Sequence, residues 1–380
     1  IGFASGFGET HFNLFRGFES HSLWSAHPLY NRPAPGKERG QSVALPSPRR
    51  PSRLPSQLNL PYYPLLKVQQ LMALRQSVQR LSRFVKEHSI RNVLVIPVSP
   101  WILSVASSIL RRNKDLNVVL LIMDDWQGHH ESYGLPYSSG RRRLLREMVN
   151  RADTRFAISR EMASHYENVF GKHWLVAHNG VEIASVNTKE SNGVGRNQIL
   201  LAGDVNVFRY DAVLAFSKAI DRHNSISAKP IEFSILGDIA SEYSRQLSRL
   251  RGIKLKGRQT HSECLNAMRS ADLLYLPLAF SDKARRISLY SLPTKLPEYL
   301  ATGKPICFHA PKESALFQVA ERFDLNPRLD STEGAALDSF LAQWSREDTV
   351  GWKSFARARV ALSQEFDIEQ LASRFQQAFV

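Results

Sequence analysis

The sequence is poor in several features that would place it in well-known classes of protein. It has only two cysteines, Cys264 and Cys307, and no apolar run approaching the ~20 residues that span a bilayer. Two isolated cysteines favour buried thiols in a reducing compartment over a disulfide framework or a zinc site. A Walker loop, zinc-ligand spacing and a nucleophile elbow are also missing. The first residues lack a basic leader with a long apolar core, so we expect no signal peptide.

Acidic residues are scarce in the first half of the chain. Residues 1–190 contain 25 basic and 14 acidic residues, a net charge of +11, whereas residues 191–380 contain 25 and 21, a net charge of +4. A positive field of this kind favours an anionic partner, such as a membrane surface, a phosphorylated acceptor or nucleic acid. The alternative is that the basic residues only keep the surface solvated.

Short apolar runs alternate with helical segments from Leu65 onward. Predicted strands such as Val118–Met123 and Ile231–Leu236 are continuous apolar runs, which is typical of buried parallel strands in βαβ units. The alternation is interrupted once and restarts at Gln198. The fold class we predict is therefore α/β, with two doubly wound Rossmann-like domains facing a cleft.

Composition sets the expected domain boundaries. We expect an N-terminal domain over residues 1–185, in which the Pro- and Ser-rich stretch 31–64 is a long loop. The polar, Gly-containing stretch 186–197 is the expected linker. A C-terminal domain should cover 198–353, and a helix at 354–380 should cross back to the first domain.

The segment Ser291–Ile306 carries the most specific pattern. A loop ends at Thr294, a helix carries Lys295 and Glu298 in its first turns, and Gly303 ends it. Free backbone N–H groups beside a lysine suit a phosphate, and a carboxylate one turn deeper can accept ribose hydroxyls. An ordinary capped helix would give the same spacing.

This segment resembles the donor-binding motif of family 4 glycosyltransferases of the GT-B type, in which two Glu separated by seven residues precede a Gly-x-Pro strand start. Glu298 falls on the second Glu, and Glu298–Pro305 continues the pattern. The first Glu position is Tyr290, which offers a hydroxyl in place of a carboxylate. The resemblance implies that Glu298 binds the ribose and Lys295 the diphosphate.

Three further segments occur in the family's order between residues 198 and 309. Leu200–Asp204 with Arg209 resembles the first donor strand and its phosphate loop, with Gly203 in the turn and Asp204 in place of the usual Arg. Phe233–Asp238 follows with Gly237, and Ile253–Arg258 supplies Gly257 and Arg258. The resemblance implies that the donor contacts are Gly203, Arg209, Gly237, Gly257, Arg258, Thr294, Lys295 and Glu298.

In the first half, Asp124 and Asp125 follow a predicted strand and precede His129 and His130. We interpret the two acids as cleft residues that stabilise charge at the anomeric carbon, and we take Asp124, Asp125 and Tyr290 as catalytic candidates. Divalent metal ligation is the competing interpretation, and capping of the next helix is the simplest one. We expect no metal and no cofactor besides the nucleotide-sugar donor.

The resemblance implies a retaining hexosyltransferase that moves a sugar from a nucleotide diphosphate sugar to a lipid-linked or cell-envelope glycan, as in polysaccharide biosynthesis. We expect it in the cytoplasm, peripheral at the inner membrane face, with Arg49–Arg53 and Arg141–Arg143 as candidate contacts to anionic lipid. Gly6–Gly8 is a candidate glycine loop. Two alternatives stay open: a glycosyltransferase that modifies nucleic acid, and a catalytically silent GT-B-like binding protein.

Overall fold

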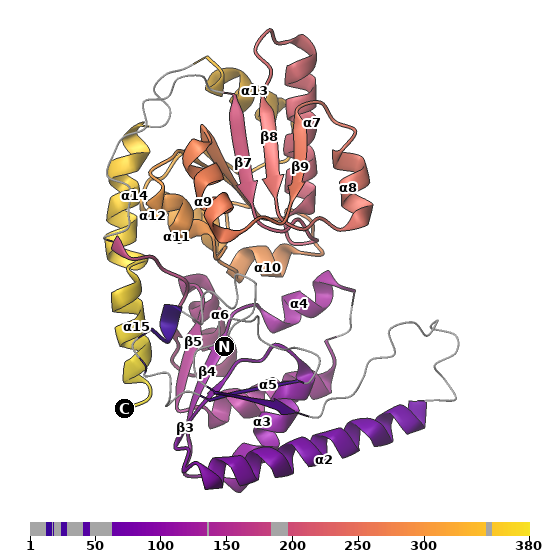
Figure 1. Ribbon diagram of the computed structural model, residues 1–380, viewed down its shortest axis with the longest axis vertical. Helices are drawn as coiled ribbons and strands as arrows, with labels where there is room; N and C mark the ends of the chain where they lie inside the picture. Colours follow the sequence, from indigo (N-terminus) through magenta and orange to yellow (C-terminus); the bar gives the residue numbers. More distant parts are fainter. Residues whose placement is uncertain are drawn as a thin grey trace.

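The computed structural model of the chain contains two α/β domains, one stacked above the other (Figure 1). Each domain is built on a parallel sheet. The structure describes residues 13–16, 18, 24–28, 41–45, 63–134, 137–183, 197–346 and 352–380. The 31–64 segment, predicted as a loop, contains a strand, β2 (Gln41–Leu45), which pairs in parallel with β1 (Trp24–Pro28). The loop prediction missed this strand.

The N-terminal domain is built on a four-stranded parallel sheet of order β3-β4-β5-β6. Its strands are β3 (Asn92–Val95), β4 (Asn117–Ile122), β5 (Thr154–Ala157) and β6 (Leu175–Val176). Its helices are α2 (Tyr63–Glu87), α3 (Pro100–Arg112), α4 (Trp126–Ser132), α5 (Ser139–Arg151) and α6 (Arg160–Phe170). Strand β4 is almost wholly buried, as its unbroken apolar sequence predicts.

The C-terminal domain holds a six-stranded parallel sheet of order β12-β11-β10-β7-β8-β9. Its strands are β7 (Gln198–Ala202), β8 (Glu232–Leu236), β9 (Ile253–Gly257), β10 (Leu273–Pro277), β11 (Ile306–His309) and β12 (Arg328–Leu329). Its helices are α7 (Tyr210–Ile226), α8 (Ser241–Leu247), α9 (His261–Ser270), α10 (Arg285–Tyr290), α11 (Leu296–Ala301), α12 (Ala315–Arg322) and α13 (Gly334–Trp344). The order reverses between β7 and β10, and ligands of such sheets bind beyond the strand ends at this point.

Alternate residues of the C-terminal strands enter two cores on opposite faces of the sheet. Leu200 and Leu274 pack into one buried cluster, whereas Leu201 and Tyr275 pack into the other. Both faces are therefore covered, which explains why these strands are apolar without the polar alternation of a half-exposed sheet.

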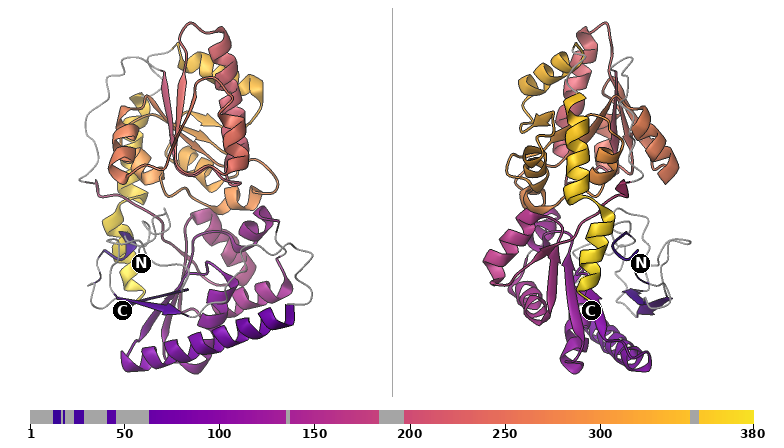
Figure 2. Two further views of the ribbon diagram at one scale, coloured as in Figure 1. Left: turned by 45° about the vertical axis from the view of Figure 1, so that its right-hand side comes forward. Right: turned by 90° about the vertical axis from the view of Figure 1, so that its left-hand side faces the viewer.

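Two helices connect the domains at the C-terminal end, where the sequence predicted a single helix over 354–380. Helix α14 (Trp352–Glu365) contributes Leu362 to a core of the C-terminal domain. Helix α15 (Ile368–Gln377) contributes Leu371 and Phe375 to the core of the N-terminal domain. Figure 2 shows the pair running along one side of both domains.

Where the chain first leaves the N-terminal domain, it meets the junction of α14 and α15. Val181 donates its N–H to the carbonyl of Phe366 (3.0 Å) and accepts from the N–H of Ile368 (3.1 Å). The two crossings between the domains are thus hydrogen-bonded to one another. The linker predicted at 186–197 lies outside the described residues except for Asn197, as do Gly6–Gly8 and Arg49–Arg53. In the part of the chain that is described, no helix combines the length and apolar character needed to span a bilayer.

Candidate active site

Two glycines form the edge of the C-terminal sheet that faces the N-terminal domain. Gly203 follows β7 and Gly237 follows β8, with φ angles of +149° and +147°. Gly203 donates its N–H to the carbonyl of Leu236 (2.7 Å). A Cβ atom on Gly237 would lie 2.6 Å from the carbonyl of Gly203, so side chains are excluded at this edge. The two glycines therefore let the ends of β7 and β8 pack backbone against backbone.

Arg209 extends over this glycine edge from the residue just before α7. One terminal nitrogen of its guanidinium would lie 2.8 Å from a Cβ on Gly203. Its Nε is buried and has no hydrogen-bond partner, and no ion pair to it occurs among the described residues. Burial lowers the pKa of Arg209. A guanidinium whose Nε has lost water without gaining a hydrogen bond is suited to an anionic ligand.

Lys295 and Glu298 form an ion pair beside this edge, with 2.6 Å between Nζ and Oε2. Helix α11 carries Glu298, and the next residue, Tyr299, ties the helix to β7 because its hydroxyl accepts the N–H of Ala202 (2.7 Å). Thr294 takes part through its backbone, since its carbonyl accepts a hydrogen bond from Asn179 of the N-terminal domain (2.9 Å). The predicted donor residues on α11 and β7 are therefore brought together.

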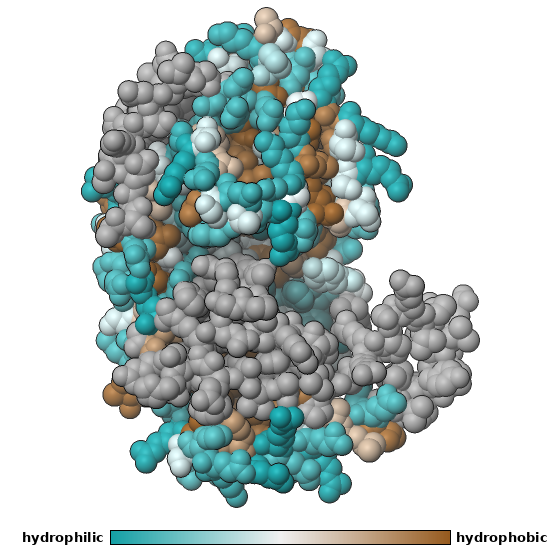
Figure 3. Space-filling view, viewed as in Figure 1, coloured by the Kyte–Doolittle hydropathy of each residue, from teal (hydrophilic) through white to brown (hydrophobic). Residues whose placement is uncertain are grey.

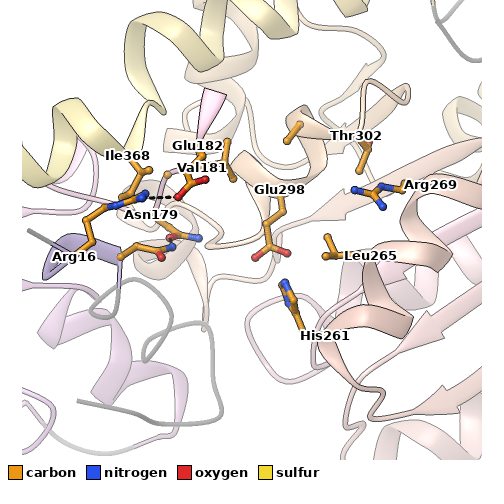
Figure 4. Close-up of a pocket in the computed structure, with 13 residues that line it drawn as sticks. Arg16, Asn179, Val181, Glu182, His261, Leu265, Arg269, Glu298, Thr302 and Ile368 are labelled. Carbon is orange, nitrogen blue, oxygen red and sulfur yellow. Dashed lines mark hydrogen bonds and ion pairs between the residues drawn. The ribbon is translucent and has the colours of Figure 1, made fainter. Parts of the chain in front are cut away.

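A pocket of about 310 Å³ lies between the domains next to Glu298. In Figure 4, Glu298 and His261 point toward one another across it, and Arg16 of the N-terminal domain is bonded to Glu182 on the far side. The wall contains polar groups from both domains. Its lining residues are Asn13, Arg16, Asn179, Gly180, Val181, Glu182, His261, Leu265, Arg269, Glu298, Ala301, Thr302 and Ile368.

Arg258, another predicted donor residue, is engaged by carboxylates. It lies 2.6 Å from Asp238 and 3.9 Å from Asp204, on the exposed rim next to the glycine edge. Asp204 also accepts the N–H of Asp238 (2.8 Å). Gly257 adopts a φ of +66° with open space around it. Because Arg258 is already paired, Arg209 and Lys295 are the cations best placed for a phosphate.

Asp125 is buried at the start of α4 with all its contacts inside the protein. Its carboxylate accepts the N–H of Gly128 (2.7 Å) and the hydroxyl of Tyr166 (3.0 Å). It also pairs with Arg286 of α10, 3.0 Å from Nε. Asp125 thus caps a helix and joins the two domains, which is the simplest of the interpretations that the sequence allowed.

Tyr290 belongs to the same interdomain cluster. Its ring stacks on His165 of α6 with centroids 4.4 Å apart, and its hydroxyl lies 3.2 Å from Nδ1 of that histidine. The guanidinium of Arg286 sits over the same ring at 5.7 Å. Tyr290, which occupies the first Glu position of the donor-binding motif, therefore directs its side chain at the N-terminal domain.

Asp124 lies beside the cluster and keeps an accessible surface. Its carboxylate accepts a hydrogen bond from Ser291 of the C-terminal domain (3.2 Å). Loss of bulk water around the carboxyl raises the pKa of Asp124, while the charge of His129 and the Ser291 bond act in the opposite direction. Of the three catalytic candidates, Asp124 alone combines an accessible carboxylate with a contact to the donor-side domain.

Comparison with known proteins shows which fold this chain shares. Residues 37–185 match the model of Glycosyltransferase Family 4. The apo lipopolysaccharide outer core galactosyltransferase WaaB is 15% identical, with a TM-score of 0.61, over 100% of this chain and 96% of that one. HepE of Anabaena, solved with UDP and glucose, is 14% identical, with a TM-score of 0.69, over 100% and 97%. A UDP-forming trehalose-phosphate synthase from Burkholderia vietnamiensis is 14% identical, with a TM-score of 0.61, over 93% and 98%. No curated relative matches by sequence.

Residues 37–185 thus resemble family 4 glycosyltransferases, and the whole chain has the GT-B fold of these solved structures. The predicted α/β fold class of two Rossmann-like domains is confirmed. The glycine edge, Arg209 and the Lys295–Glu298 pair share the face of the C-terminal domain that points toward the N-terminal domain.

The four polar residues after β4 (Asp124, Asp125, His129 and His130) do not converge on one point. Asp125 is directed at Arg286, and His130 is buried with its Nδ1 2.6 Å from the carbonyl of Trp126. Within the described ranges, no three His, Cys, Asp or Glu side chains gather as they would around a metal ion. The positions of these side chains do not favour the metal-site interpretation of this segment.

The sequence analysis considered His129 only as a possible metal ligand and did not single out Arg286. His129 packs against Tyr133 (centroids 5.2 Å apart) and Phe208 of the other domain (5.9 Å), and its buried Nδ1 has no hydrogen-bond partner. Arg286 joins three side chains of the N-terminal domain. Ser291, by contrast, begins the segment Ser291–Ile306 that the sequence analysis singled out.

Proposed function

We propose that this protein is a glycosyltransferase, which binds a nucleoside diphosphate sugar at the glycine edge and transfers the sugar to a lipid-linked or cell-envelope glycan. The observation that carries the proposal is the guanidinium of Arg209, which lies over Gly203 with a buried Nε that has no hydrogen-bond partner. A diphosphate would accept hydrogen bonds from this guanidinium and add the negative charge that suits it.

The remaining donor contacts follow from this position. Lys295 stands on the same side of the sheet and would share its charge between the diphosphate and Glu298. Glu298, facing the pocket, would accept ribose hydroxyls. HepE was solved with UDP and glucose, and WaaB is a galactosyltransferase, so UDP and UDP-hexoses are the first ligands to test.

We propose that transfer proceeds with retention and without a metal ion. The bond between the anomeric carbon and the diphosphate breaks, and the acceptor oxygen bonds to that carbon from the same face. The acceptor proton leaves with the departing phosphate oxygen. Arg209 and Lys295 would stabilise the charge that develops on the diphosphate, and Asp124 would stabilise the positive anomeric centre. Asp125 and Tyr290 would act by holding the domains in register.

Calorimetric titration with UDP and with uridine tests the donor site. Arg209→Met should weaken UDP binding about tenfold or more while changing uridine binding little, because the lost contact is to phosphate. Arg222→Met is the control, since Arg222 lies on α7, the helix that follows Arg209, and pairs with Asp338 (2.8 Å). Equal UDP affinity in the wild type and Arg209→Met would overturn the placement of the donor.

A catalytically silent binding protein is the second candidate, favoured by Tyr290 at the first Glu position and Asp204 at the usual Arg position. The two candidates differ in turnover. A transferase releases UDP from UDP-sugar when acceptor lipid or glycan is added, whereas a silent protein binds the donor and leaves it intact. Product release with a membrane extract as the acceptor source separates them.

A further inference from the structure

One polar side chain of the N-terminal domain reaches the backbone of the donor-binding motif. Asn179 follows β6, and its Nδ2 donates to the carbonyl oxygen of Thr294, the residue before Lys295 (2.9 Å). Hydrophilic side chains are widespread on the visible surface of the C-terminal domain (Figure 3), whereas Asn179 is only 4% exposed. A buried amide costs free energy unless its hydrogen bonds are made, so the contact with Thr294 is needed in the folded chain.

A second amide fixes which way round the Asn179 side chain lies. The carbonyl oxygen of Thr294 can only accept, so the nitrogen of the Asn179 amide must face it. The oxygen of that amide then faces Asn13, whose Nδ2 donates to it (2.9 Å). A flipped Asn179 amide would instead set its oxygen against the oxygen of Thr294. Both hydrogen bonds therefore require the same orientation of the Asn179 side chain.

Both amides are held in place by their neighbours in the chain. Leu14, next to Asn13, is fully buried in the core of the N-terminal domain. Arg16 pairs with Glu369 of α15 (3.0 Å). Two residues after Asn179, the backbone is hydrogen-bonded to the junction of α14 and α15. Asn179 therefore presents its amide to the donor-binding motif from a fixed position.

The hydrogen bond to Thr294 acts on Lys295 through the peptide unit that joins these two residues. A peptide unit is planar, so a carbonyl held in one direction also fixes the plane of the next N–H. That plane sets the direction in which the Lys295 side chain leaves the backbone. Lys295 in turn lies 2.6 Å from Glu298, which lines the same interdomain pocket as Asn179 (Figure 4). The Asn179 amide is thus one peptide unit away from a cation proposed for the diphosphate.

We infer that Asn179 is a positioning residue of the donor site, which directs Lys295 at the diphosphate. This role rests on the proposed function, because it concerns the same site. It makes the affinity for a nucleoside diphosphate depend on a contact that the N-terminal domain supplies. A hydrogen bond that only joined the domains would not act through Lys295, and this difference is measurable.

Calorimetric titration with UDP and with uridine tests the positioning role in a double-mutant cycle. Asn179→Leu removes the amide at nearly constant volume, so UDP binding should weaken about fivefold while uridine binding changes less than about twofold. In the Lys295→Ala background the same change should alter UDP binding less than about twofold, because the residue that Asn179 positions is already gone. Asn179→Asp sets an oxygen against the oxygen of Thr294, and it should weaken UDP binding at least as much as Asn179→Leu. Asn13→Leu should have a smaller effect of the same kind.

Ser159→Ala is the matched control. The Ser159 hydroxyl donates to the carbonyl of Tyr290 (2.6 Å), so it also joins a side chain of the N-terminal domain to the backbone of the C-terminal domain. Its removal should lower stability in urea unfolding and leave UDP affinity within about twofold of the wild type. An equal loss of UDP affinity in Ser159→Ala and Asn179→Leu would show that any contact between the domains has this effect, and would overturn the positioning role.

Three further results would overturn the positioning role while leaving the donor site in place. They are wild-type UDP affinity in folded Asn179→Leu and Asn179→Asp, an equal loss for uridine and UDP, and an undiminished effect in the Lys295→Ala background. Circular dichroism shows whether each variant is folded, and if Asn179→Leu is not, Asn179→Asp and Asn13→Leu decide. Wild-type protein that bound none of UDP, GDP and ADP would overturn the positioning role and the proposed function together.

Discussion

Arg286 of α10 and Asp125 at the start of α4 form an ion pair across the two domains, with 3.0 Å between Nε and Oδ2. They are 161 residues apart in the chain. Asp125 is 1% exposed, whereas Arg286 retains 28% of its side-chain surface. Tyr290 and His165 stack beside the pair, so the domains meet through an ordered polar and aromatic contact.

Removal of the cation from this pair should be costly. Arg286→Met leaves the buried Asp125 carboxylate without its counter-charge, and we expect about 3 kcal/mol of destabilisation, since breaking a buried pair costs roughly 3–5 kcal/mol. Urea unfolding measures it. Arg285→Met, on the same helix but exposed, should change stability by less than about 0.5 kcal/mol. A similar small effect for Arg286→Met would show that water replaces the guanidinium.

Lys295 and Glu298 are proposed to bind different parts of the nucleotide, the diphosphate and the ribose respectively. Glu298→Gln should weaken uridine and UDP alike by about fivefold, which corresponds to about 1 kcal/mol of lost charge-assisted bonding to ribose. Lys295→Ala should weaken UDP more than uridine. Titration calorimetry of both variants decides, with Lys254→Ala on the exposed side of β9 as the control. If both variants kept full affinity while only their melting temperature fell, the pair would serve the helix alone.

Asp124 should affect turnover more than binding. Asp124→Asn removes the negative charge proposed to face the anomeric centre, and we expect kcat to fall about 100-fold while the UDP affinity changes little. Because its pKa is raised, the wild-type rate should begin to fall on acidification at a higher pH than for an ordinary aspartate. The variant should lose that acidic limb. Asp115→Asn, exposed at the other end of β4, is the control, and an unchanged acidic limb in Asp124→Asn would contradict the assignment.

His309 makes the C-terminal domain sensitive to acid. Its ring is buried between the Tyr275 hydroxyl (2.6 Å from Nδ1) and the Ser331 carbonyl (2.9 Å from Nε2). Burial lowers its pKa from 6.5 to about 4. Between these two values the unfolded chain binds a proton that the folded chain does not, so stability falls as pH falls from 6.5 to 4, by about 3 kcal/mol in all.

Urea unfolding at pH 7 and pH 5 measures this contribution, which is about 2 kcal/mol over that interval. His309→Gln cannot titrate, so the difference in stability between the two pH values should shrink by that amount, whatever the variant's stability at pH 7. An unchanged difference would mean that the imidazole already takes up its proton in the folded state.

Local pattern was enough to predict the strands but not the contacts between domains. The apolar run Val118–Met123 could only be a buried strand, and β4 occupies it. Helices α4 and α10 are seven and six residues long, too short for a periodic signal to stand out. The ion pair between Asp125 and Arg286 joins residues 161 positions apart, so no local sequence pattern predicts it. One missed boundary was readable, since Asp367 caps α15 through the N–H of Glu369, and Asp is a common helix-capping residue.

The junction of α14 and α15 also bears on the order of events during synthesis. Ile368, Leu371 and Phe375 belong to the N-terminal core, yet the ribosome makes them only after the entire C-terminal domain. Domains commonly fold one after another as the chain emerges. Here the core of the first domain lacks the side chains of α15 until the second domain has been translated. A chain interrupted before residue 368 would therefore leave the N-terminal core incomplete, although that domain is made first.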